Sequence, residues 1–81
     1  MPKIKHMPTL YRDGNLKVCM YSNDHSPPHF HVLTPDERAS VTIEGLQILA
    51  GELSNKTMNK AKKWAQDHKV ELTQKWEEIN G

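Results

Sequence analysis

Three of the five histidines in this chain lie within seven residues of one another, and imidazole is the side chain best suited to proton transfer near neutral pH. These histidines are His25, His29 and His31, and Asp24 precedes them. If residues 29–33 form a strand, side chains alternate between its faces, so His29 and His31 project from one face about 7 Å apart. The prolines at 27–28 stiffen the loop that carries His25, and we expect this loop to bring His25 toward the other two rings.

Three kinds of site fit this cluster. In the first, His25, His29 and His31 bind a divalent transition metal and leave one coordination position open for water. Zinc is the leading candidate for this metal. In the second, two of the histidines act as general acid and base on an RNA phosphodiester, the 2′-hydroxyl is the nucleophile, and Asp24 orients one ring. In the third, the rings are structural and bond to backbone groups. The residues alone leave all three open.

Basic side chains near the cluster are the candidates for phosphate binding. In the acid–base hypothesis Lys17 or Arg12, on a predicted neighbouring hairpin, holds the phosphate. Lys60 and Lys63 belong to a basic run on a predicted helix, and a solvated helix face also explains them. His68 lies on the apolar stripe of that helix, where we expect a hydrogen-bonded core histidine rather than a fourth metal ligand.

The first half of the chain carries strand and turn signals. Asp13-Gly14 between residues 8–12 and 16–21 predicts a hairpin, because both residues accept positive φ. Pro35-Asp36 predicts a type I turn in a second hairpin. A last strand or a turn is expected at residues 46–49. The side chains expected in the core from the alternation are Leu16, Val18, Met20, Phe30 and Val32.

The second half of the chain has the sequence pattern of a helix. Neither Gly nor Pro occurs from Ser54 until Gly81, and apolar residues recur at spacings of three and four. The unbroken phase predicts one long helix, although Asp67-His68 is a possible break. We therefore predict an α+β fold with a small twisted antiparallel sheet of four to five strands packed against one long C-terminal helix. The domain is expected over residues 7–81, with a β-rich part (8–53), a helical part (54–79) and an N-terminal extension (1–6).

Composition narrows the class of protein. The 81 residues are 36% hydrophobic and 26% charged, with a formal net charge of +1, which excludes a strongly basic nucleic-acid binder. The single cysteine, Cys19, excludes an internal disulfide and a zinc site built from cysteines. No apolar run approaches the roughly 20 residues of a membrane span, and the first residues do not resemble a secretory signal. A cytoplasmic location is expected.

The segment Tyr21-Ser22-Asn23-Asp24-His25-Ser26-Pro27-Pro28-His29-Phe30-His31-Val32 resembles a small bacterial family described as a domain of unknown function. That family shows a Tyr-Ser-Asn-Asp/Glu-His-x-Pro-Pro-His-Phe/Val-His-Val core after a Met-Pro-Thr start, and it ends in a helix with a late tryptophan. Met7-Pro8-Thr9 and Trp76 are similar to that start and that end, so the likeness covers about residues 7–78. The resemblance marks Asp24, His25, His29 and His31 as site candidates.

Genes of this family often stand in pairs that are suspected toxin–antitoxin modules. The resemblance therefore implies a small protein that is one member of such a pair, with the adjacent-gene product as partner and RNA as a candidate substrate. The alternative is a non-catalytic module that docks a small protein through a sheet edge or the C-terminal helix. Open sheet edges also make a homodimer an option.

Overall fold

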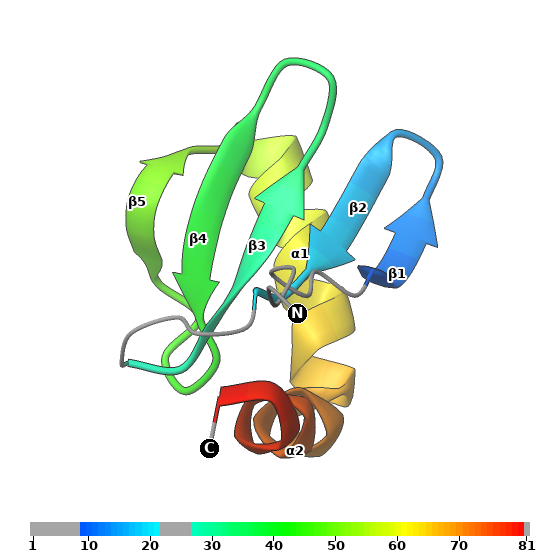
Figure 1. The fold of residues 1–81 in the computed structure, drawn as a ribbon. Helices are drawn as coiled ribbons and strands as arrows, with labels where there is room; N and C mark the ends of the chain where they lie inside the picture. Colours follow the sequence, from blue (N-terminus) through cyan, green and yellow to red (C-terminus); the bar gives the residue numbers. More distant parts are fainter. Residues whose placement is uncertain (1–8, 22–26, 81) are drawn as a thin grey trace, which may run out of the picture.

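The computed structural model describes residues 9–21 and 27–80, which form a five-stranded antiparallel sheet and two helices (Figure 1). The strands are adjacent in sequence order: β1 (Thr9–Asp13), β2 (Leu16–Cys19), β3 (His29–Leu33), β4 (Arg38–Thr42) and β5 (Ile48–Glu52). The helices are α1 (Asn55–Asp67) and α2 (Lys69–Asn80). The predicted α+β class and strand number are confirmed. The predicted extension (1–6), Asp24 and His25 lie outside the described residues.

Short turns fix the register of the sheet. The first hairpin forms, but its turn is one residue later than predicted: Asp13 pairs with Leu16, and Gly14-Asn15 are the central residues. Gly14 has a φ of 61°, which the first central residue of a type II′ turn requires. The second hairpin closes through Thr34, whose backbone N–H donates to the Glu37 carbonyl at 2.9 Å. Both strand pairings are therefore anchored by local turn chemistry.

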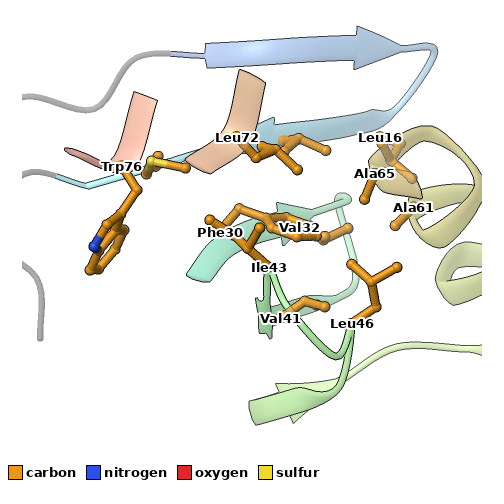
Figure 2. Packing of buried hydrophobic residues seen from close by; sticks show 12 residues of the cluster. Leu16, Phe30, Val32, Val41, Ile43, Leu46, Ala61, Ala65, Leu72 and Trp76 are labelled. Atoms are coloured by element: carbon orange, nitrogen blue, oxygen red, sulfur yellow. The ribbon is translucent and has the colours of Figure 1, made fainter. Parts of the chain in front are cut away.

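The core lies between the sheet and the helices (Figure 2). Every side chain predicted to be buried from the strand alternation is at most 3% exposed. From the helices, Ala61 and Ala65 of α1 and Leu72 and Trp76 of α2 complete the same cluster. Small alanines on α1 allow that helix to pack close to the strands, whereas α2 inserts larger side chains.

The predicted single long helix is wrong, because the chain breaks at His68. The His68 imidazole Nδ1 donates to the Trp64 carbonyl at 2.8 Å, the carbonyl that an unbroken helix would pair with the His68 backbone N–H. That backbone N–H donates to the Ala65 carbonyl instead, at 3.1 Å. The His68 carbonyl then accepts from Leu72 N–H and starts α2. The break lies at Asp67-His68, the possible position that the sequence offered, but the apolar phase continues across it and therefore favoured one helix.

The start of α1 is tied to the β3–β4 turn by one carboxylate. Ser54 is the N-cap and its side chain accepts from Thr57 N–H at 3.2 Å. The Glu37 carboxylate accepts from the Ser54 backbone N–H, and its Oε1 also accepts from the Thr57 hydroxyl at 2.8 Å. The Ser54 backbone N–H, followed by the Thr57 hydroxyl, lowers the pKa of Glu37 below its ordinary value.

We expect Glu37→Gln to destabilise the protein at neutral pH but not in strong acid. A carboxylate whose pKa is lower in the folded chain stabilises it above the ordinary glutamate pKa of about 4.5, and this stabilisation is lost as the pH falls through the folded-state pKa. Urea unfolding of wild type and variant at a series of pH values measures this. The neighbouring Asp36→Asn is the charge-matched control, and a gap between Glu37→Gln and wild type that stays constant with pH would contradict the assignment.

Candidate functional site

The sheet face opposite α1 collects the polar side chains of the strands. Phe30 and Val32 point into the core and are fully buried, so His29 and His31 belong to the other face, which we call the outer face. The register extends this assignment to the other strands, because residues directly opposite each other share a face. The described strand residues of the outer face are Thr9, Arg12, Lys17, Cys19, His29, His31, Leu33, Arg38, Ser40, Thr42, Ala50 and Glu52.

Two rows of side chains cross the outer face at right angles to the strands. The first row, the cation row, runs through Arg12, Lys17, Leu33, Arg38 and Glu52. The second row, the histidine row, runs through Thr9, Cys19, His31, Ser40 and Ala50. Neighbours within a row are about 5 Å apart and the rows are about 7 Å apart. The cation row therefore places Lys17 and Arg38 diagonally next to His31, Arg12 one strand further away, and one carboxylate at the β5 end.

The two described histidines of the motif lie side by side. The ring centroids of His29 and His31 are 5.2 Å apart in an edge-to-face arrangement. Tyr21 stacks on His31 with centroids 4.1 Å apart, and Trp76 of α2 lies 5.2 Å from His29. In Figure 1, α2 crosses the end of the sheet where β3 begins. His29 is consequently only 8% exposed, whereas His31 is half-buried.

A backbone carbonyl fixes the orientation of the His29 ring. Its Nδ1 lies 2.7 Å from the Pro27 carbonyl oxygen, and a carbonyl can only accept, so Nδ1 carries a proton. In the neutral ring Nε2 is then the nitrogen with the lone pair. The stiff proline loop thus sets the tautomer that a general base or a metal ligand requires.

Cys19, the cross-strand partner of His31, is buried and is not activated. Its side chain is 1% exposed, and burial raises the pKa of the thiol. The charge of Lys17 and a hydrogen bond from Tyr21 lower that pKa without reversing the shift. A thiol with a raised pKa is a poor nucleophile at neutral pH, which agrees with the inert role that a lone cysteine usually has.

Native protein is therefore expected to react with iodoacetamide at least about 100-fold more slowly than unfolded protein, because the thiol must be exposed by opening of the sheet. Cys19 is the single cysteine, so the rate of mass increase reports on this site alone. Lys17→Ala is the companion variant. It should leave the slow rate nearly unchanged, and labelling of the native wild type at the unfolded rate would overturn the assignment.

A hollow of about 260 Å³ opens on the outer face beside the histidine pair, and we call it the β4–β5 hollow. Tyr21 and His31 line it, together with Arg38 and Ser40 of β4 and the Ala50-Gly51 segment of β5. Aromatic, hydroxyl and guanidinium groups therefore surround one small concave space next to His31.

A family model covers most of the chain, including the hollow and both described histidines. The match is to "Domain of unknown function (DUF4160)" and spans residues 15–77. The chain belongs to this family. No curated protein and no solved structure matches the chain. In the DUF4160 match Lys17, His29, His31 and Arg38 lie inside the family region, whereas Arg12 and the predicted Met7-Pro8-Thr9 start precede it.

The structure separates the predicted phosphate-binding residues into two groups. Arg12 and Lys17 are cross-strand partners in the cation row. Lys60 belongs to α1, where its Nζ is 2.9 Å from Asp13 Oδ2 and lowers the pKa of Asp13. Lys63 is exposed on the same helix. The phosphate-binding roles of these four residues stay predictions, and only the first pair lies on the face of the DUF4160 histidines.

Sequence reasoning missed three members of the site: Tyr21, Arg38 and Ser40. A signal for Ser40 and Arg38 was present, since a four-residue turn at 34–37 pairs Leu33 with Arg38 and, by counting, His31 with Ser40.

Among the described residues no group of three or more His, Cys, Asp or Glu side chains could hold a metal ion. The predicted three-histidine site needs His25, which lies outside the described residues. None of the described helices combines the length and the apolar character needed to cross a bilayer.

Proposed function

We propose that this protein binds single-stranded RNA on its outer face and cleaves a phosphodiester with His29 and His31, as one member of a toxin–antitoxin-type pair. The observation that carries the proposal is the strand register, which sets the cation row one row away from His31. Cations position the phosphate backbone, and paired imidazoles supply a base and an acid near neutral pH.

The proposed reaction needs no added reagent. Nε2 of His29, whose Nδ1 is held by Pro27, removes the proton of the 2′-hydroxyl. The 2′-oxygen forms a bond to phosphorus, the bond from phosphorus to the 5′-oxygen breaks, and His31 gives its proton to that leaving oxygen. The products are a 2′,3′-cyclic phosphate and a 5′-hydroxyl. The Tyr21 ring stacks on His31, with ring centroids 4.1 Å apart, and limits the rotation of that imidazole.

Incubation of the purified protein with labelled single-stranded RNA, and with DNA of the same sequence, tests this function. RNA should be cut to cyclic-phosphate ends and DNA should remain intact, because DNA lacks the nucleophile. Three phosphate contacts predict that log K for binding falls with log salt concentration with a slope of about −2, and Arg38→Ala should reduce that slope by about 0.7. RNA that is neither bound nor cut would refute the proposal.

A metal site is a second candidate, favoured by the hydrogen bond that fixes His29. A ligating imidazole usually donates its other N–H to a carbonyl or carboxylate, as Nδ1 does here. In that case His25, His29 and His31 would hold the zinc, and the ion would supply an activated water. The same assay with a chelator separates the two candidates. An unchanged rate favours the metal-free pair, whereas loss of activity and its return on adding zinc favour the metal.

The alternative of a non-catalytic docking module is favoured by one edge of the sheet. All five residues of β5 are exposed, and Ile48 and Leu49 are 41% and 47% exposed. Trp76, by contrast, is 7% exposed in the core and offers no docking surface. The adjacent-gene product would add a strand to β5. Co-purification should then be lost in Ile48→Lys and retained in Val70→Lys, a matched control on α2 at a residue that is 71% exposed.

A further inference from the structure

Both β5 residues that line the β4–β5 hollow, Ala50 and Gly51, are small. Gly51 has no side chain, and a Cβ on it would lie 2.2 Å from the Arg38 carbonyl oxygen, so glycine keeps β5 close against β4. Ala50, opposite Ser40, adds one methyl group. The hollow is therefore built into the strand sequence, beside the histidine row.

The chemistry of the hollow suits one planar heterocycle. Tyr21 and His31 contribute rings to its lining, and Arg38 and Ser40 contribute hydrogen-bonding groups. Bases of single-stranded RNA stack on aromatic side chains and are recognised along their hydrogen-bonding edges. A volume of about 260 Å³ is below the range of roughly 300–1,000 Å³ that drug-sized ligands occupy, so it suits one base rather than two.

We infer that the β4–β5 hollow binds one unpaired base of the RNA, next to the phosphate that the histidines attack. This inference rests on the proposed function. His31 belongs both to the wall of the hollow and to the histidine pair. In the histidine row Ala50 is two strand spacings, about 10 Å, from His31, so the hollow extends from His31 toward β5. The ligand is a nucleotide of single-stranded RNA, because a paired base cannot enter.

Two leucine substitutions in the histidine row test the inference. Ala50 lies on β5, two strands away from His31, and Ala50→Leu fills the hollow from that strand. Thr9→Leu adds a leucine two strands to the other side, outside the hollow, and is the matched control. The substrate is an RNA oligomer in which a single 2′-hydroxyl remains and the others are methylated, so one phosphodiester is cleavable. Two further oligomers lack the base on the 5′ or the 3′ side of that bond.

For wild type and Thr9→Leu, removal of the base on one side of the bond should raise KM by about 10-fold, within the range measured for stacked bases. Ala50→Leu should show the raised KM with the intact oligomer and no further rise without the base. Ser40→Val, which removes the hydroxyl and fills the hollow from β4, should behave like Ala50→Leu. Circular dichroism and urea unfolding verify that each variant is folded.

The two proposals fail in distinguishable ways. If wild type cleaves intact and base-free oligomers with equal KM, or if Ala50→Leu keeps the wild-type response to base removal, the base site is refuted and RNA cleavage stands. If wild type neither binds nor cleaves any of the oligomers, the proposed function and the base site are both refuted.

Discussion

Replacing His31 by alanine is expected to lower the rate of RNA cleavage by about 100- to 10,000-fold, which is the usual contribution of a general acid. His31 is half-buried and does not belong to the hydrophobic core cluster, so the substitution leaves that cluster intact. His29→Ala should lower the rate to a similar extent. The double variant should lose little more than either single one, because the two rings act on one reaction.

The pH profile and chemical rescue separate a proton-transfer role from a structural one. A base and an acid acting together give a bell-shaped dependence of kcat/KM on pH, and each single variant should lose one limb of it. Added imidazole should restore part of the rate in His31→Ala. His68→Gln is the control, since that ring is engaged at the helix break with the Trp64 carbonyl. A His31→Ala protein with the wild-type rate and the wild-type bell-shaped pH profile would refute the acid–base hypothesis.

Much of the fold could be predicted from the sequence because it depends on local signals. The alternation around Phe30 and Val32 fixes which face of β3 is buried, and the turn residues at 35–36 fix the second hairpin. The first hairpin shows the limit of such signals: a turn centred on 13–14 would place Arg12 opposite Asn15, whereas the observed turn at 14–15 places it opposite Lys17. One residue in a turn thus decides whether two cations are neighbours.

The remaining features depend on contacts between residues that are distant in the sequence or on competition between equivalent donors. The helix break at His68 arises because an imidazole N–H replaces a backbone N–H at the same carbonyl, which leaves the apolar periodicity unchanged. The burial of His29 arises from Trp76, 47 positions further along the chain. The β4–β5 hollow requires the strand order, since only the pairing of β4 with β5 brings Ala50 next to Ser40. No spacing rule within one segment carries that information.

Replacing Gly51 by alanine is expected to destabilise the protein by about 2–4 kcal/mol, a large share of the roughly 4–12 kcal/mol typical of a domain of this length. Two effects add. The φ of Gly51 is 84°, where an L-residue is strained. The added Cβ would also lie 2.2 Å from the Arg38 carbonyl oxygen and 2.8 Å from the Ala39 Cα. Both contacts are with backbone, so relief requires β5 to move away from β4.

Gly14→Ala provides the matched control, because Gly14 has a φ of 61° but no atom within 4 Å of the position of an added Cβ. It shares the backbone strain and lacks the collision, so about 1 kcal/mol is expected. The difference between the two variants in urea unfolding therefore isolates the close approach of β4 and β5. Equal destabilisation would mean that this approach is not tight. A detached β5 would also open the β4–β5 hollow, so Gly51→Ala should weaken RNA binding while Gly14→Ala should not.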